Sequence, residues 1–391
     1  MDNSKIPPKE FELAEKAIIS GDADQLSRFL NKYRESPQIR QWYGSSGPYS
    51  IEEKNFKEDA QTIIADQHAF DTWAAFKNFK EELSGKASMV SRFEAAVDAI
   101  VTGDEYALKH LLLEDPDLIH ARSVRNHHAT LLNYIGANGI EGFRQSTPKN
   151  AVQITEILLN AGAVVDAVGD MYKGSTTLGL VATSIHPLKT GVQKELIDIL
   201  LKYGADPNFS ISKGYNEGGN LIVGCLANGR GEAAAYLSQR GAVMNLEGAA
   251  GVGNLEKVKS YFNKDGSLKD GATGKQRNAG FMWACEYGKN NIIEFLLEKG
   301  FDIATEFEGM TGLHWAVIGD EPDTVNLLLR RNAPLEIKNS YGGTVLSQAL
   351  WFAYNDPKPN RLAIIETLIA AGAVIDPEWN KYIDEIRLRY S

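Results

Sequence analysis

The stretch Thr311-Gly312-Leu313-His314-Trp315-Ala316 marks the start of a helix in the C-terminal half of the chain. A threonine directly before an apolar run caps a helix through its hydroxyl oxygen. The same arrangement recurs at three other places, namely Thr130-Leu131-Leu132, Thr176-Thr177-Leu178 and Thr344-Val345-Leu346. The recurrence predicts that one structural unit is repeated along the chain.

A second pattern follows these starts, in which an apolar helix ends in a glycine. The stretch Ile199-Leu200-Leu201-Lys202-Tyr203-Gly204-Ala205-Asp206 is one copy, and Gly162, Gly300 and Gly372 close similar copies. The residue after the last helical turn often has a left-handed backbone, which glycine accepts without steric cost. We therefore predict a positive φ at all four glycines.

The repeats extend over most of the chain. Residues 11–30 share nine identities with residues 93–112 at a constant offset of 82, beginning with Phe11-Glu12 and Phe93-Glu94. We predict about eight or nine degenerate units. Their approximate spans are 11–36, 93–125, 126–168, 173–208, 217–246, 247–275, 276–306, 309–339 and 342–376.

These units resemble ankyrin repeats, whose signature is Thr-Pro-Leu-His-x-Ala, a second helix and Gly-Ala-Asp. The proline is absent from every copy, and the signature histidine is present only at His314. The segment around Phe70-Asp71-Thr72-Trp73 resembles a helical element of uncharacterised bacterial ankyrin-repeat domain-containing proteins. The resemblance implies an all-α ankyrin-repeat solenoid that binds proteins through a concave groove and through the finger loops between units.

The predicted organisation has four parts. Residues 1–36 form an outlying repeat-like helix pair, and residues 37–92 form a helical insert that serves as an N-terminal cap. Residues 93–376 are the repeat array, and residues 377–391 are an amphipathic C-terminal capping helix. Terminal caps with a polar outer face keep such arrays soluble.

The composition argues against several partners and compartments. The 391 residues include 41 Lys and Arg against 51 Asp and Glu, a net charge of −10, and no basic stripe, so we expect no nucleic-acid partner. No apolar run reaches the roughly 18 residues of a membrane helix, and residues 1–8 lack an apolar leader. With only Cys225 and Cys285, the chain fits a reducing compartment. We expect a cytoplasmic monomer without membrane association.

Three units lengthen the turn between their two helices, at residues 140–150, 183–191 and 353–361. Each long turn contains proline, which ends the first helix. The first two long turns belong to neighbouring units, so we expect them to touch.

The candidate partner-binding residues lie in the fingers and long turns and on the first helices. One group is Arg122, Arg125, His127, His128, Tyr134, Asn138, Arg144, Asp170, Tyr172 and His186. These residues are either solvated loop tips or a recognition surface, since exposed aromatic and Arg side chains anchor many interfaces. The recognition assignment requires Arg125, Tyr172 and Trp315 to be exposed.

A second group lies further along the chain. It consists of Trp283, Glu306, Glu308, Trp315, Trp351 and Tyr354. The tryptophans are either packing between repeats or an aromatic binding stripe, and the two glutamates favour a basic partner segment.

The sequence offers little catalytic chemistry. His127 and His128 are adjacent and point in opposite directions in an extended finger, so we expect no metal site. The glycine-rich stretches 248–253 and 271–276 lack the spacing of phosphate-binding loops, so we expect no cofactor. We therefore predict a non-catalytic module that binds a protein partner. The alternative is a small-ligand or enzyme-like site at residues 122–190, with a deep pocket holding His128, Arg144, Asp170 or His186.

Overall fold

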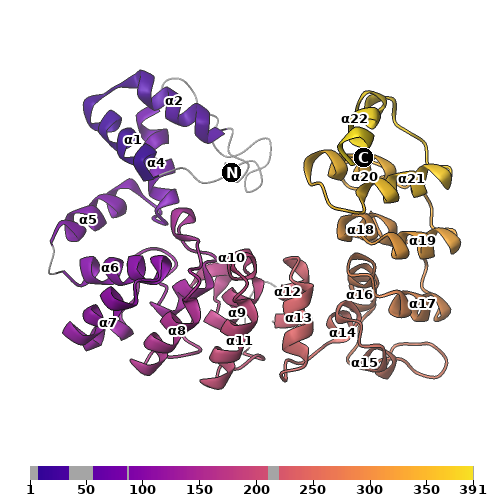
Figure 1. Cartoon of the computed structure of the whole chain (residues 1–391), viewed down its shortest axis with the longest axis horizontal. Coiled ribbons are helices and arrows are strands. Elements are labelled where there is room, and N and C mark those ends of the chain that lie inside the picture. Colours follow the sequence, from indigo (N-terminus) through magenta and orange to yellow (C-terminus); the bar gives the residue numbers. More distant parts are fainter. Residues whose placement is uncertain (1–7, 35–55, 86–87, 210–219, 391) are drawn as a thin grey trace. The chain divides into compact units, whose positions relative to one another are not determined.

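The computed structural model describes residues 8–34, 56–85, 88–209 and 220–390. It divides the chain into two compact units, residues 1–219 and 220–391 (Figure 1). The boundary falls inside the predicted repeat array of residues 93–376. The predicted all-α class is confirmed, because the described residues contain only two short strands, β1 (Glu306–Phe307) and β2 (Met310–Thr311).

The N-terminal unit is a succession of short helices. Its α-helices are α1 (Pro8–Ser20), α2 (Ala23–Arg34), α4 (Phe56–Gln67), α5 (Trp73–Ser84), α6 (Met89–Thr102), α7 (Glu105–Glu114), α8 (Ala151–Asn160), α9 (Thr177–Thr183), α10 (Ile185–Thr190) and α11 (Gln193–Lys202). Its 3₁₀ turns are η1 (Pro116–His120), η2 (Leu132–Gly136), η3 (Gly142–Arg144) and η4 (Met171–Lys173).

Helices α6 and α7 show how the sequence builds one helix pair. The Ser88 hydroxyl caps α6 by accepting from the Ser91 amide at 3.0 Å. Gly103 ends α6 with a φ of 79°, and the Asp104 carboxylate then caps α7 by accepting from the Ala107 amide at 2.9 Å. The chain therefore reverses direction within two residues, and the two helices pack against each other.

The first four helices share one apolar core. Phe11 and Leu30 from α1 and α2 pack with Ile64 of α4 and with Phe76 and Phe79 of α5. All five side chains are at most 5% exposed. The predicted insert thus contributes α4 and α5 to this core, whereas its residues 37–55 lie outside the described residues.

The C-terminal unit continues the helix pairs. Its α-helices are α12 (Leu221–Ala227), α13 (Gly231–Ser238), α14 (Leu246–Val252), α15 (Leu255–Ser260), α16 (Gly274–Glu286), α17 (Asn290–Glu298), α18 (Gly312–Gly319), α19 (Pro322–Arg330), α20 (Val345–Asn355), α21 (Arg361–Ala370) and α22 (Asn380–Tyr390). A 3₁₀ turn, η5 (Pro377–Trp379), precedes α22.

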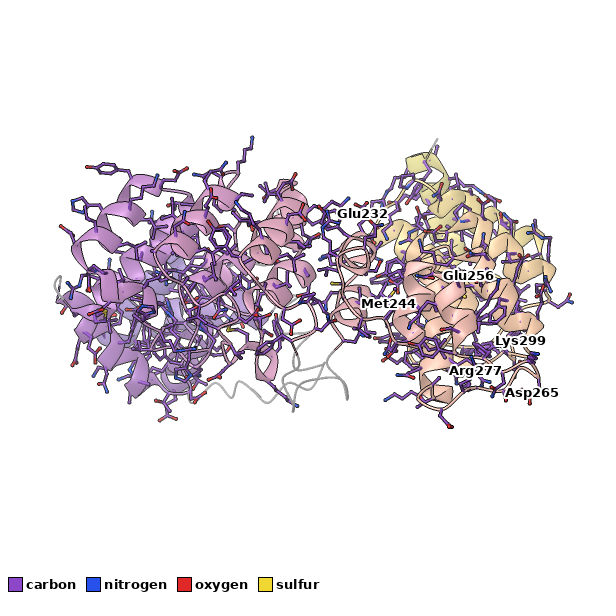
Figure 2. All side chains as sticks on the ribbon, turned by 90° about the horizontal axis from the view of Figure 1, so that it is seen from below. Glu232, Met244, Glu256, Asp265, Arg277 and Lys299 are labelled. Carbon is purple, nitrogen blue, oxygen red and sulfur yellow. The ribbon has the colours of Figure 1, made fainter. Side chains whose placement is uncertain are left out.

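These helices stand in two rows (Figure 1). Helices α14, α16, α18 and α20 pack side by side in one row, and α15, α17, α19 and α21 form the other. Many apolar side chains of these helices are buried, while charged side chains such as Asp265 and Lys299 lie at the edge of the unit (Figure 2). The two cysteines, Cys225 and Cys285, are reduced thiols, and both are fully buried.

Three of the four predicted helix starts, at Thr176, Thr311 and Thr344, and all four predicted glycine ends are confirmed. Thr311 and His314 form a reciprocal cap at the start of α18, with 2.8 Å between the Thr311 hydroxyl and the His314 Nδ1. The four glycines have positive φ; the values are 99° at Gly162, 92° at Gly204, 82° at Gly300 and 96° at Gly372. At Thr130 the structure differs from a regular helix start, because a 3₁₀ turn, η2, follows it.

The long turns connect successive units. The Thr190 hydroxyl donates to the carbonyl of Thr147 at 3.1 Å, so the first two long turns touch as predicted. In the third, the buried Arg361 guanidinium donates to the carbonyl of Val317, and Lys358 donates to that of Ile318 at 3.2 Å. These side chains satisfy carbonyls at the end of α18 that have no partner within the helix.

We expect Gly103→Ala to destabilise the chain more than Gly191→Ala. Both glycines have almost the same backbone, with φ of 79° and 81°. A left-handed alanine costs about 1–2 kcal/mol at either position. At Gly103 the added Cβ would also lie 2.9 Å from the Cβ of Pro148, whereas nothing lies within 4 Å at Gly191. Urea unfolding followed by circular dichroism measures the difference, and equal losses would contradict the packing described here.

Candidate functional site

Two finger loops of the N-terminal unit are tied to each other. Arg122 and Thr130 pair across the first finger, and Gly169 and Ser175 pair across the second. The Arg122 guanidinium donates to the carbonyl of His128 at 2.9 Å and to that of Val168 in the second finger at 2.8 Å. The two loops therefore form one body rather than two independent tips.

Side chains at the tips add two further links. The His128 Nδ1 lies 2.7 Å from the Asp170 carboxylate, and the Tyr172 hydroxyl donates to the Asn138 side-chain oxygen at 2.7 Å. The side chains of His128 and Asp170 are 55% and 66% exposed, and Tyr172 is 48% exposed. We call Arg122, His128, Asn138, Asp170 and Tyr172 the finger surface.

The backbone of the finger surface is held in an uncommon conformation. The φ angles are 43° at His128, 52° at Tyr172 and 65° at Lys173. Few residues other than glycine adopt this region, and surrounding contacts must hold those that do. The links from His128 to Asp170 and from Tyr172 to Asn138 supply such contacts, so the exposed side chains are presented in a fixed geometry.

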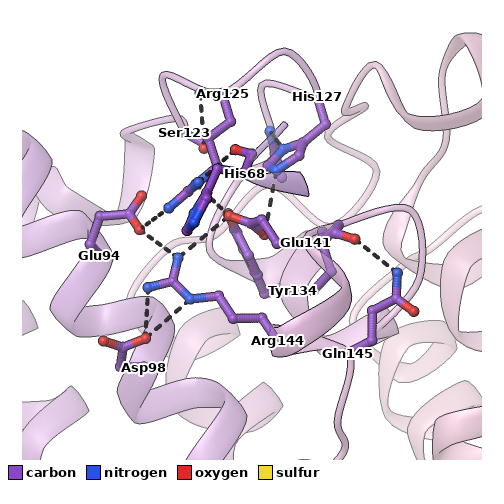
Figure 3. A network of polar contacts seen from close by, with 12 residues as sticks. His68, Glu94, Asp98, Ser123, Arg125, His127, Tyr134, Glu141, Arg144 and Gln145 are labelled. Carbon is purple, nitrogen blue, oxygen red and sulfur yellow. Dashed lines mark hydrogen bonds and ion pairs between the residues drawn. The ribbon is translucent and has the colours of Figure 1, made fainter. Parts of the chain in front are cut away.

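Beneath the first finger lies a group of buried charges, which we call the buried ion cluster: Glu94, Asp98, Arg125, Glu141 and Arg144 (Figure 3). Arg125 donates to the Glu94 carboxylate at 2.8 Å and pairs with Glu141. Arg144 pairs with Glu94 and Glu141 and donates to Asp98 at 2.7 Å. Apart from the exposed Asp98, these side chains are at most 8% exposed.

The groups of the buried ion cluster keep one another ionised despite their burial. Burial alone would raise the pKa of Glu141, but Arg125, His127 and Arg144 outweigh it and lower this pKa to about 2. Burial opposes the charge of Arg144, yet Glu94, Glu141 and Asp98 raise its pKa above the usual value. Burial, reinforced by Glu141 and Glu94, raises the pKa of the neighbouring Tyr134 well above 10.

Arg125 and its neighbour Asn126 join the first finger to the helical insert. The Arg125 guanidinium donates to the carbonyl of His68 at 2.6 Å and lies 4.5 Å from the centre of the Phe79 ring. The Asn126 side chain donates to the Asp71 carboxylate at 2.6 Å, and its amide donates to the carbonyl of Ala69 at 2.9 Å. The predicted cap is therefore held on the repeats by hydrogen bonds from one finger.

The exposure predicted for several binding residues is wrong. Six of them are buried, namely Arg125, His127, Tyr134, Arg144, Trp283 and Trp315. The two arginines are buried because carboxylates neutralise them, and the Tyr134 hydroxyl lies 3.5 Å from Glu141. Trp283 and Trp315 pack edge to face with ring centres 5.4 Å apart, which favours packing between repeats over a binding stripe.

The other predicted residues of the second group are at least partly exposed. Trp351 is 50% exposed, and Glu306 and Glu308 are exposed on the hairpin that precedes α18. Tyr354 is half-buried against Tyr382 of α22, with ring centres 5.2 Å apart. In the N-terminal unit, His186 is also half-buried.

The alternative prediction, a deep pocket holding His128, Arg144, Asp170 or His186, is wrong. Arg144 is committed to buried ion pairs, whereas His128 and Asp170 are more than half exposed. Within the described ranges, no three His, Cys, Asp or Glu side chains are placed to share a metal ion. No described helix is long and apolar enough to cross a membrane.

Three residues that contact the buried arginines of this region were not predicted from the sequence. They are Glu94, Glu141 and His68, which surround the two buried arginines. A signal was present for Glu94, because it lies four residues after Val90 and three before Val97 and so shares their apolar helix face. Nothing in the sequence indicated that His68 and Glu141, which are distant in sequence, meet at Arg125.

A family model described as ankyrin repeats in three copies matches residues 246–341 and 281–378. Residues 246–378 therefore match ankyrin repeats, and the all-α ankyrin-repeat fold class is confirmed. Ankyrin repeats are in general modules for protein–protein interaction and are typically not catalytic.

Three curated proteins share short segments with this chain. The ankyrin repeat domain-containing protein SAT10 of Stachybotrys chartarum is 28% identical over 145 residues, or 37% of this chain and 7% of that protein. The E3 ubiquitin-protein ligase hecd-1 of Caenorhabditis elegans is 33% identical over 67 residues, 17% of this chain and 2% of the ligase. Inversin of Gallus gallus is 37% identical over 78 residues, 19% of this chain and 7% of inversin.

The chain thus spans less than a tenth of the length of each of these proteins. Among solved structures, the human ASB11 ankyrin repeat domain aligns with 72% of this chain and 99% of its own length. The identity of that alignment is 17% and its TM-score is 0.32.

We expect Arg125→Met to cost about 3–5 kcal/mol of stability, because it leaves Glu94 and Glu141 buried with less neutralising charge. The matched control is Arg331→Met, which removes an exposed guanidinium 3.8 Å from Glu294. The control should cost less than about 1 kcal/mol. Urea unfolding measures both, and a comparable small loss in the two variants would contradict a structural role for the buried ion cluster.

We also expect acid to weaken the N-terminal unit through His68. Burial, followed by the charge of Arg125, lowers the pKa of this ring to about 3. The unfolded chain therefore takes up a proton between pH 6.5 and 3 that the folded chain refuses, so stability falls as the pH falls through this window. The slope is about 1.4 kcal/mol per pH unit.

The comparison with His68→Phe isolates this effect. The His68 ring nitrogens are buried without a hydrogen-bond partner, and the ring stacks on Phe76 at 4.7 Å. Phenylalanine therefore removes the titration, and its loss of two unpaired nitrogens shifts stability equally at every pH. Glu141 adds a loss between pH 4.5 and 2, and Glu286, whose pKa burial raises to about 7, acts in the opposite direction. Both contributions are common to the two proteins. Identical pH profiles would show that His68 is not the acid-sensitive group.

Proposed function

We propose that this chain is a non-catalytic module that binds a protein partner, and that the finger surface of the N-terminal unit is one contact site. The observation that supports this proposal most strongly is the fixed geometry of His128 and Tyr172. Both are about half exposed, both have positive φ, and both are hydrogen-bonded to a neighbouring element. Ankyrin repeats are in general protein-interaction modules, and exposed aromatic side chains anchor many interfaces.

Rigidity supports this proposal through the entropy of binding. A flexible loop loses conformational freedom when a partner fixes it, and each immobilised side chain costs about 0.5–1.5 kcal/mol. In the finger surface the Arg122 guanidinium already holds the loops, because it donates to the carbonyl of His128 in the first finger and to that of Val168 in the second. A partner therefore meets an aromatic ring, an imidazole and a carboxylate in their binding positions.

The C-terminal unit supplies a second contact site in this proposal. Trp351 is a half-exposed aromatic side chain on α20. Glu306 and Glu308 are exposed on the hairpin of β1 and β2, which precedes α18. The two carboxylates favour a basic segment of the partner. We further propose that the chain acts as a cytoplasmic monomer, without nucleic-acid or membrane partners.

The test is affinity capture from a native lysate with Tyr172→Asn beside the wild type. Asparagine tolerates the left-handed backbone better than most residues, so the loop is kept while the aromatic ring is lost. We expect at least one protein that the wild type retains to be lost or reduced about tenfold, which corresponds to about 1.4 kcal/mol.

The matched control is Tyr106→Asn, because Tyr106 is 82% exposed on α7, outside the fingers. It should retain the same proteins as the wild type. If the wild type and both variants retain identical sets of proteins, the finger surface is not the contact site. If the wild type retains no specific protein, the binding function itself is contradicted.

A further inference from the structure

Helices α1, α4 and α5 enclose an open groove of about 510 Å³, which we call the N-terminal groove. It lies in the first helices of the chain and includes none of the residues of the finger surface. Its volume falls within the range of clefts that bind ligands or peptide side chains. The groove is therefore a separate candidate for a contact with another molecule.

The floor of the N-terminal groove is apolar and partly open to solvent. Ile19 of α1 is 85% exposed, and Trp73 at the start of α5 is half-buried; both line the groove. Phe76 and Ile18, which also line it, are 1% and 4% exposed and belong to the core. An exposed aliphatic side chain and a half-buried indole ring in one groove mark a surface that gains from being covered.

The rim of the groove carries more positive than negative groups. Three lysines and two glutamates line it, whereas the whole chain has a net charge of −10. Lys80 is paired with Glu15 at 3.3 Å. Lys57 and Lys77 form no ion pair with a carboxylate of the described residues, and both side chains are exposed.

The backbone chemistry of the groove favours a helical occupant. All of its described walls are helices, so it presents no strand edge with free amide and carbonyl groups. A partner segment must then satisfy its own backbone hydrogen bonds, as a helix does. Helices enter such grooves with apolar side chains at positions i, i+3, i+4 and i+7.

We propose that the N-terminal groove binds an amphipathic helix of a partner protein that carries acidic residues beside its apolar stripe. The apolar stripe covers Ile19 and Trp73, and the acidic residues face Lys57 and Lys77. This contact shares no residue with the finger surface or with the contact site proposed for the C-terminal unit, so the groove adds a further site to the module.

The test uses two labelled peptides of about 18 residues, a length at which isolated helices become stable. Both have leucine at positions i, i+3, i+4 and i+7, with glutamate at the flanking positions in one and lysine in the other. Fluorescence anisotropy with the full-length chain measures affinity. We expect saturable binding of the glutamate peptide, weakening with added salt, and at least about tenfold weaker binding of the lysine peptide.

The variant Ile19→Ser, Lys77→Glu removes the exposed apolar group and reverses one free charge of the groove. Both side chains are exposed, so the fold should be unchanged by circular dichroism. We expect its affinity for the glutamate peptide to fall about tenfold or more. The matched control Leu113→Ser, Lys149→Glu makes the same changes at exposed positions outside the groove and should bind as the wild type does.

Three results would overturn the proposal. The first is equal affinity for the two peptides, which would indicate unspecific apolar association. The second is unchanged affinity in the groove variant, and the third is no binding of the glutamate peptide at all. Vesicles of anionic lipid serve as a further probe. If they bind the wild type but not the groove variant, while the glutamate peptide does not bind, the groove faces a lipid surface instead.

Discussion

The pairing of Arg125 and Arg144 with Glu94 and Glu141 is the interaction on which the N-terminal unit depends. A buried charge is strongly unfavourable unless it is paired and hydrogen-bonded, so none of these four groups can be moved or removed alone. Their partners come from α6, the first finger and the first long turn, and Arg125 also reaches the carbonyl of His68. The ion pairs thereby fix the relative positions of segments that are distant in sequence.

This requirement explains why the finger surface is rigid. Arg125 is buried, whereas its neighbours Val124 and Asn126 are exposed. The buried guanidinium therefore anchors the first finger to the core of the N-terminal unit. Arg122 in turn links the first finger to the second, because its guanidinium donates a hydrogen bond to the carbonyl of Val168. The buried charges therefore hold the finger loops in place, and they are not accessible to a partner. The exposed His128 and Tyr172 are the side chains that a partner can contact.

The periodic features could be predicted from the sequence because they depend on local physics. Gly204 needs a left-handed backbone and Thr311 caps the helix that follows it, and both effects act within a few residues. The candidate site was predicted only in part. Tyr172 is exposed as required, but Arg125 and Trp315 are buried against Glu94 and Trp283, which lie 31 and 32 residues earlier in the sequence. Repeat phase does not reveal which side chains meet over such distances.

The two cysteines of the C-terminal unit have a practical consequence for studying this protein. Burial raises the pKa of Cys225 to about 12 and that of Cys285 well above its usual value, so neither thiol forms the reactive thiolate near neutral pH. A cysteine introduced at any exposed position would therefore react with a maleimide dye far faster than the native pair. Fluorophores or spin labels can then be attached at single chosen sites on the otherwise unaltered chain, for example at the finger surface or beside the N-terminal groove.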